Sequence, residues 1–146
     1  MKPGIDYIGV SVGALIFNSQ RKILLCKRSK NAKNERGCWE APGGAVEFGE
    51  TLEHAIIREM KEELGVELEL LRQMPAANHI IPNEHQHWIP SAFICRIKEG
   101  KKPKIMEPKK CDEIGWFSLN ALPRPLSIIT KIDVNRYKKM KKNYTS

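Results

Sequence analysis

Long apolar runs are missing from this chain of 146 residues. No stretch approaches the roughly 20 apolar residues that a helix needs to cross a bilayer. The opening sequence, MKPGIDYIGV, holds one lysine and has no small-residue cleavage site after an apolar core. We therefore expect no signal peptide, no membrane partner and a cytoplasmic location.

Paired cysteines are missing as well, since the four cysteines are scattered and form no Cys-x-x-Cys motif. This pattern argues against a zinc ribbon or a disulfide framework, and predicts free thiols that are buried or half-buried. His85 and His87 lie two residues apart but have no third nitrogen or sulfur ligand nearby in the sequence. Metal binding by histidine is therefore the weaker interpretation.

Aromatic residues are few, at 7% of the chain, and they are not interleaved with the basic residues. The formal net charge is nevertheless +8, concentrated in residues 98–110 and 136–142. Clustered lysines can follow a nucleic-acid backbone, but stacking aromatics and a recognised nucleic-acid motif are absent. We expect a solvated basic surface whose field attracts a small polyphosphate, with no nucleic-acid partner.

The residues that are present suit one globular domain. Hydrophobic residues make up 41% of the chain and charged residues 29%. We expect a hairpin of two strands, residues 5–17 and 22–27, joined by a turn at residues 18–20. A polar loop follows, and further strands are predicted at residues 45–48, 87–97 and 111–119. A basic last helix is predicted at residues 128–142, docked by four apolar side chains: Ile129, Ile132, Tyr137 and Met140.

A central helix is predicted between Thr51, a plausible N-cap, and Gly65, which suits a left-handed C′ position. Its core-facing stripe recurs every four residues: Leu52, Ile56, Met60 and Leu64. At ~100° per residue, Glu59, Glu62 and Glu63 project from one face of this helix. Because carboxylates so close together repel each other, the pattern predicts a divalent-metal site.

A family motif spans residues 44–66. It consists of Gly44, Glu50, Arg58-Glu59-Met60, Glu62-Glu63 and Gly65-Val66. Its spacing resembles the Nudix box at every specified position. The preceding WEAPGG and the later segment CDEIGWF are similar to the family's lead-in and closing strand. The resemblance covers most of the chain and leaves the basic C-terminal tail least constrained.

The resemblance implies a single Nudix domain over residues 1–146, with an α/β/α sandwich in which a mixed β-sheet lies between helices. It also implies hydrolysis of a nucleoside diphosphate linked to another moiety, with Mg²⁺ or Mn²⁺ as cofactor. By matching position, Glu59, Glu62 and Glu63 become the metal ligands. Glu50 and Arg58 support them, since an arginine that pairs with a carboxylate fixes its orientation.

A general base is also needed near the attacking water. The resemblance leaves two candidates, a glutamate of the box or one from a later loop. Glu107 is the preferred loop residue and Glu113 a poorer one. The alternative for Glu107 is a surface carboxylate among lysines.

Substrate contacts are less constrained. Lys27 and Arg28 end the second predicted strand, where they either meet terminal phosphates or form an exposed hairpin end. Gly43 and Gly44 belong to a Pro-Gly-Gly segment, in which positive φ would let backbone N–H groups approach an anion. Trp39 either flanks the nucleobase or packs in the core. His87 and Trp88, at the start of the predicted strand 87–97, are further candidates for nucleobase contacts.

The substrate itself is open. Only about forty residues precede the box, which favours a nucleoside triphosphate split to monophosphate and pyrophosphate, as in MutT-like members. Pro82, sixteen residues past the box, instead resembles ADP-ribose hydrolases, so an ADP-ribose or nucleotide-sugar hydrolase is the alternative. A non-catalytic nucleotide-sensing module and an RNA 5′-end hydrolase remain further alternatives, and the sequence leaves a homodimer open.

Overall fold

Two β-sheets form the centre of the molecule, a computed structural model that describes residues 1–145 and the side chains of residues 1–141. The larger sheet follows the order β4-β1-β7-β5, and β6 also pairs with β7. Its strands are β1 (Gly9–Ile16), β4 (Gly43–Ala45), β5 (Leu68–Gln73), β6 (His79–Ile81) and β7 (Gln86–Ile97). The smaller sheet comprises β3 (Trp39–Glu40), β2 (Ile23–Arg28) and β8 (Cys111–Phe117), in that order.

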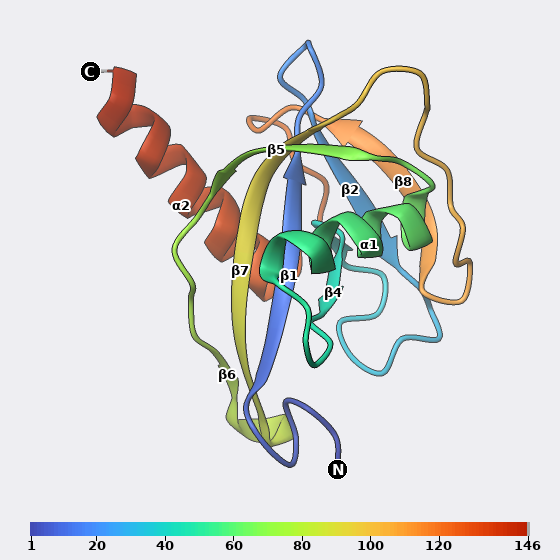
Figure 1. Ribbon diagram of the computed structural model, residues 1–146, viewed down its shortest axis with the longest axis vertical. Helices are drawn as coiled ribbons and strands as arrows, with labels where there is room; N and C mark the ends of the chain where they lie inside the picture. The colour runs from blue at the N-terminus through green and yellow to red at the C-terminus, as the bar shows by residue number, and fades with distance from the viewer. Residues whose placement is uncertain (146) are drawn as a thin grey trace.

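The larger sheet is mixed, since β1 runs parallel to β7 and antiparallel to β4. The helices α1 (Leu52–Leu64) and α2 (Ile128–Thr145) pack against different apolar clusters (Figure 1). A short 3₁₀ turn, η1 (Pro82–Glu84), links β6 to β7. The α+β architecture, with a mixed sheet between helices, confirms the predicted fold class.

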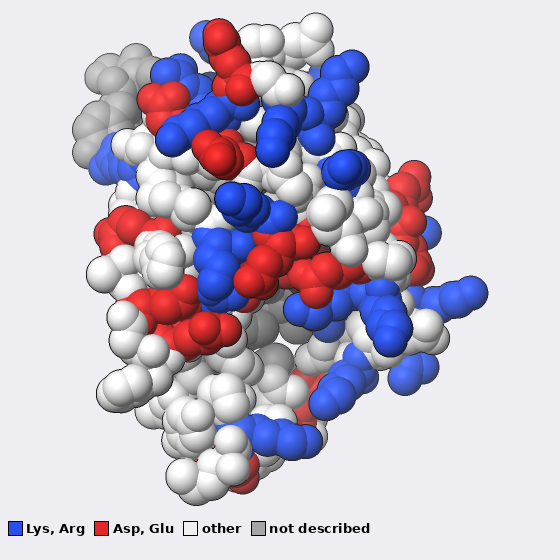
Figure 2. All heavy atoms as spheres, turned by 45° about the vertical axis from the view of Figure 1, so that its right-hand side comes forward, with Lys and Arg blue, Asp and Glu red and all other residues white. Residues whose placement is uncertain are grey.

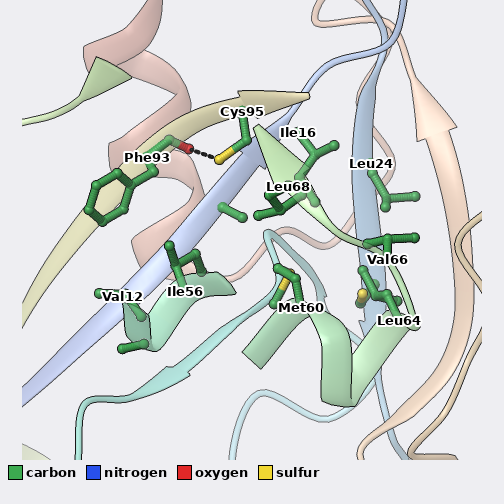
Figure 3. Packing of buried hydrophobic residues seen from close by; sticks show 13 residues of the cluster. Val12, Ile16, Leu24, Ile56, Met60, Leu64, Val66, Leu68, Phe93 and Cys95 are labelled. Atoms are coloured by element: carbon green, nitrogen blue, oxygen red, sulfur yellow. Dashed lines mark hydrogen bonds between the residues drawn. The ribbon is translucent and has the colours of Figure 1, made fainter. Parts of the chain in front are cut away.

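Helix α1 forms where the sequence predicts it. The Thr51 hydroxyl accepts a hydrogen bond from the His54 N–H at 3.1 Å, and Gly65 ends the helix at φ 68°. Ile56, Met60 and Leu64 are buried against the sheet, as Figure 3 shows. Because the apolar stripe fixes the rotation of the helix, Glu59 lies buried against β4 while Glu62 is exposed to solvent.

The predicted hairpin is wrong. Apart from one isolated bridge, between Phe17 and Ile23, β1 pairs with β4 and β7 while β2 pairs with β3 and β8. The strand predicted from residue 5 begins at Gly9, and the one predicted at residues 45–48 is β4. Gly43 and Gly44 therefore lie in a strand instead of a turn with positive φ. The turn at residues 18–20 was predicted correctly, but the local sequence does not indicate which sheet each of the flanking strands joins.

Helix α2 docks through Val134, which is 3% exposed, together with two of the predicted contacts, Tyr137 and Met140. The segment that leads into it runs beside β3. Trp39 N–H donates to Pro125 O, and the Ala41 N–H donates to Thr130 Oγ1 at 3.0 Å. The start of α2 therefore holds the strand that leads to the box. The side chain of Lys142, in the predicted basic tail, lies outside the described residues.

The cysteines are free thiols, as predicted: Cys26 and Cys95 are buried, and Cys38 and Cys111 are half-buried. Within residues 1–145, no helix is both long and apolar enough to cross a membrane.

Candidate active site

Arg58 organises the acidic face of α1. Its Nε and Nη2 donate to both oxygens of Glu50, at 2.6 and 2.8 Å. Its Nη1 donates to Glu59 at 3.0 Å and to Glu62 at 3.3 Å. One guanidinium therefore orients three carboxylates, as expected for a planar group with five donors.

Glu50 is the anchor of this network. Its side chain is only 8% exposed, and its carboxylate also accepts the Glu47 N–H at 2.9 Å. The Arg58 hydrogen bonds, with help from the backbone at Glu47, lower the pKa of Glu50 to about 2. Glu50 is therefore ionised at neutral pH and holds Arg58 in place. This geometry fits the supporting role that the resemblance implies for both residues.

Gly44 makes room for Glu59. A Cβ at residue 44 would overlap the Glu59 carboxylate, because β4 passes directly over the buried face of α1. A Cβ at Gly43 would likewise overlap the carbonyl oxygen of Val12 in β1. The two glycines thus allow β4 to lie close to α1 and β1, and a larger residue at either position would prevent this.

Glu63 lies in a cavity of about 420 Å³, whose polar lining also includes Glu40, Glu107 and Lys110. Burial, together with the negative charges of Glu59, Glu107 and Glu40, raises the pKa of Glu63 to about 9. Lys110 acts in the opposite direction, and its Nζ lies 3.5 Å from the Glu107 carboxylate. Three carboxylates and four cationic side chains therefore line the cavity, the other cations being Arg28, Lys33 and Lys109. Figure 2 shows acidic side chains gathered beside a hollow that basic side chains also flank.

These residues fit a hard divalent cation. Their oxygen donors are the type that Mg²⁺ and Mn²⁺ prefer, and the raised pKa of Glu63 marks a place where added positive charge is stabilising. Among residues 1–145, however, no three His, Cys, Asp or Glu side chains are assembled as a ready chelate. Arg58 lies between Glu59 and Glu62 instead. A small cation held by one or two carboxylates, with water and substrate oxygens completing its shell, needs no such chelate.

A second cavity, of about 290 Å³, adjoins the first and shares Arg28, Glu40 and Gly43 with it. Arg28 Nη1 donates to Glu40 at 3.1 Å, so this ion pair lies where the two cavities meet. The pKa of Glu40 is raised by burial, and the positive charge of Arg28 offsets only part of this rise. The two cavities form one cleft with an acidic end at Glu63 and a second end on the other side of the pair.

The second end of the cleft combines an aromatic ring with polar groups. Trp88 lines it, and its indole N–H donates to Gln86 at 3.0 Å. Asp133 of α2 lines it too, and burial raises the pKa of this carboxyl to about 6, although Arg136 acts against the shift. Such a wall can stack against a flat ring and accept hydrogen bonds from its edge.

A profile of the NUDIX domain matches residues 8–138. The chain belongs to the Nudix family. A crystal structure of the MutT NUDIX hydrolase from Burkholderia pseudomallei superposes with a TM-score of 0.82 and is 35% identical. That match covers 89% of this chain and 98% of the other.

Curated Nudix relatives carry several names. The ADP-ribose pyrophosphatase of Methanocaldococcus jannaschii is 34% identical over 109 residues, which cover 75% of this chain and 62% of that protein. The 8-oxo-dGDP phosphatase NUDT18 of Mus musculus is 31% identical over 115 residues, which cover 77% of this chain and 33% of NUDT18. The chain therefore spans from a third to about three-fifths of the length of these two relatives.

The Nudix fold brings together most of the residues named from the sequence. Arg58, Glu50, Glu59 and Glu62 form one network, and Glu63 and Glu107 share a cavity. Arg28 and the two glycines, Gly43 and Gly44, line the second cavity.

Three predicted substrate contacts lie elsewhere. Trp39 is 8% exposed and packs edge-on against Phe117 at 5.0 Å, so its ring belongs to the core. His87 lines a separate cavity near the N-terminal segment, because alternate residues of β7 face opposite sides of the sheet. Lys27 pairs across the sheet with Trp39 and Glu113, and lines neither cavity of the cleft.

Sequence reasoning missed Glu40 and Asp133. Glu40 was visible in the lead-in WEAPGG, where a carboxylate beside a buried tryptophan was a usable signal. Asp133 had no such signal, since only the docking of α2 brings it to the cleft. Its burial, at 6% exposed, is a tertiary effect.

Proposed function

We propose that this Nudix protein is a Mg²⁺-dependent hydrolase of phosphoric anhydride bonds in nucleoside diphosphate derivatives. The observation that carries the proposal is the buried carboxyl of Glu63, which shares a cavity with Glu107 and whose pKa is raised to about 9 by burial and by the nearby charge of Glu59. A divalent ion, when bound there, offsets the charge of phosphate oxygens and makes an attacking water more acidic. Mn²⁺ has the same ligand preference and would substitute.

The chain's own residues supply position and proton transfer. Arg58 fixes the orientation of Glu59 and Glu62 through hydrogen bonds from its Nη1. Glu107, which faces Glu63, is placed to accept the proton of the attacking water, and Lys110 at 3.5 Å stabilises its carboxylate. The alternative base is a box glutamate. Kinetics of Glu107→Gln and Glu63→Gln would show which of the two carboxylates is the base. The variant that lacks the base should have a lower kcat and a pH profile without its acid limb.

The preferred substrate is a nucleoside triphosphate, converted to monophosphate and pyrophosphate. The cleft supports it, because its second end offers Trp88 for stacking and Asp133 as an acceptor for base N–H groups. The basic lysines of the first cavity, Lys109 and Lys110, suit the charge of the outer phosphates. The resemblance to a MutT NUDIX hydrolase over 98% of that chain also favours this substrate class.

An ADP-ribose or nucleotide-sugar hydrolase is the second candidate. Two observations favour it: the relative named ADP-ribose pyrophosphatase, and Pro82 at the start of η1. The η1 loop reaches the cleft side of the molecule, where Glu84 accepts a hydrogen bond from Asn34 at 3.2 Å.

A product assay distinguishes these candidates. Purified protein would be incubated with Mg²⁺ and with purine and pyrimidine triphosphates, ADP-ribose and a nucleotide sugar, and the products separated by chromatography. We expect pyrophosphate release from a triphosphate, and none in EDTA. Release of ribose phosphate from ADP-ribose alone would establish the second candidate. Tight binding of one nucleotide with no turnover of any would overturn the proposed hydrolase.

A further inference from the structure

A groove of about 1090 Å³ lies away from the active site. Residues 17–21, the end of β7 with the loop that follows it, β8 and α2 form its walls. In Figure 1 the turn after β1 and the end of β7 lie at the top of the molecule, whereas β4 and the loop into α1 lie lower. Among the described residues, the groove shares no lining residue with either cavity of the active-site cleft.

The floor of this distal groove is apolar and partly aromatic. Phe17 and Tyr137 stack there with ring centroids 4.8 Å apart, at an interplanar angle of 27°. Trp116 of β8 lines the same groove beside the buried Leu24. Aromatic surfaces of this kind bind flat rings, each stacked base being worth about 1–3 kcal/mol in single-stranded nucleic-acid sites.

The rim of the groove is basic. Six lining side chains are cationic and one, Glu99, is anionic; the cations are Arg21, Arg96, Lys98, Lys101, Lys102 and Lys141. Arg96 is already paired with Glu69, at 2.8 and 3.0 Å. Within the described part of the chain, Arg21, Lys101 and Lys102 form no salt bridge. Much of the chain's net charge of +8 therefore surrounds this groove and has no partner in the active-site chemistry.

We propose that the distal groove is a second binding site, which takes a nucleotide by its base and its phosphates. An apolar floor alone would suit many ligands, and a basic rim alone would attract any anion. Together they select a ligand with a flat ring at one end and several negative charges at the other. The site requires no divalent ion, since lysine and arginine neutralise the phosphates directly.

The experiment measures ATP binding to the full chain in EDTA, by equilibrium dialysis. EDTA removes the divalent ion that the proposed hydrolysis needs, and the two pairs of lysine variants below separate binding at the distal groove from binding that remains in the cleft. We expect one ATP per chain, with affinity that falls as salt is added. The double variant Lys101→Glu/Lys102→Glu should weaken this binding about tenfold or more, since two charged contacts become repulsive. Its Mg²⁺-dependent hydrolysis rate should stay at the wild-type level.

The matched control is Lys138→Glu/Lys139→Glu, which makes the same charge change on exposed residues of α2 outside the groove. It should bind ATP within about twofold of wild type, apart from the long-range field. Equal weakening by the two double variants would overturn the proposal, because only net charge would then matter. Competition by inorganic tripolyphosphate as strong as that by ATP would also overturn it, because the aromatic floor would then contribute nothing.

Discussion

At the scale of single residues, Arg58 is the group on which the geometry of the acidic face depends. Its Nε and Nη2 donate hydrogen bonds to Glu50, and its Nη1 donates to both Glu59 and Glu62. A lysine at this position would keep the positive charge but would lack the planar guanidinium with its fixed set of donors. The carboxylates would therefore be oriented less well. Arg58→Lys should lower kcat/KM roughly 10–100-fold, as is typical when groups that orient metal ligands are changed.

Steady-state kinetics across a Mg²⁺ titration would check this prediction. The expected signature is a raised Mg²⁺ requirement together with reduced turnover, while thermal unfolding stays cooperative. Wild-type kinetics in Arg58→Lys would show that charge alone, without the fork geometry, is sufficient.

Gly44 offers a test of close packing. A methyl group there would overlap the Glu59 carboxylate, so Gly44→Ala should displace that side chain and lower hydrolysis sharply. Gly13→Ala is the matched control, because Gly13 pairs with β4 in the same sheet and a Cβ there would meet only Pro42 O, at 3.9 Å. Activity and thermal stability would be measured for both variants. Equal losses in the two would refute a specific role for space at residue 44.

Glu63 predicts how stability depends on pH without metal. Its folded-state pKa of about 9 lies above the ordinary value of 4.5, so folding favours the protonated carboxyl. The stabilisation is fully present below the unfolded pKa and is lost as pH rises through the folded one. In EDTA, the free energy of unfolding should therefore fall between about pH 5 and pH 9 more steeply in wild type than in Glu63→Gln.

Urea unfolding of both proteins in EDTA at several pH values would measure this difference, because the variant cancels the contribution of other titrating groups. Adding Mg²⁺ should flatten the wild-type curve, since a bound cation stabilises the ionised carboxylate. Parallel curves for the two proteins in EDTA would mean that Glu63 titrates normally.

At the scale of elements, α2 stabilises the fold and holds the lead-in strand. Val134 is 3% exposed in the cluster that also contains Leu15, Ile23 and Trp39. Val134→Ala should lower the free energy of unfolding by roughly 1–3 kcal/mol through lost apolar contact. It should leave kcat/KM at the wild-type value well below the melting temperature, because Val134 lines neither cavity of the cleft.

Chemical denaturation and kinetics on the same preparation would test this separation of stability from activity. The matched change is Ile128→Ala, at a residue 52% exposed on the same helix, which should cost little stability. A fall in kcat/KM in Val134→Ala without a fall in stability would indicate that α2 takes part in catalysis directly.

The elements also show how far the sequence predicts structure. Helix α1 was predictable because its cap, its apolar period and its terminal glycine all agree, which is local information. The partners of β1 and β2 were not, since a turn at residues 18–20 fits a hairpin as well as a crossing between sheets. Gly43 and Gly44 suggested a turn, whereas the contact that requires them, with Val12 and Glu59, exists only in the folded chain.

At the scale of the whole molecule, the carboxylates of α1 were predictable, whereas the second end of the cleft was predicted only in part. The carboxylates of α1 share one motif, so spacing alone predicts that they meet. Asp133 and Trp88 come from α2 and β7 and meet only through tertiary packing. His87 and Trp88 were named together because the sequence does not indicate which face of β7 is turned to the cleft, and the structure places Trp88 there and His87 in a separate cavity.

Net charge gave a correct but incomplete prediction at this scale. The sequence indicates a basic surface, and the structure divides its segment 98–110: Lys109 and Lys110 line the cleft beside three carboxylates, whereas Lys98, Lys101 and Lys102 line the distal groove. The cleft therefore combines carboxylates with cations, whereas the lining of the distal groove is mainly cationic; we propose cation binding at the first site and anion binding at the second.

The most direct test of the central claim is the Mg²⁺-dependent turnover of Glu62→Gln. Glu62 is 55% exposed, so losing its charge should leave the fold intact and relieve repulsion on α1. We predict a loss of kcat/KM of about a hundredfold or more at unchanged or higher melting temperature. The matched variant Glu53→Gln, on the same helix but outside the Arg58 network, should retain wild-type turnover. Near-normal turnover in Glu62→Gln would contradict the assignment of the acidic face of α1 as the metal-binding, catalytic surface.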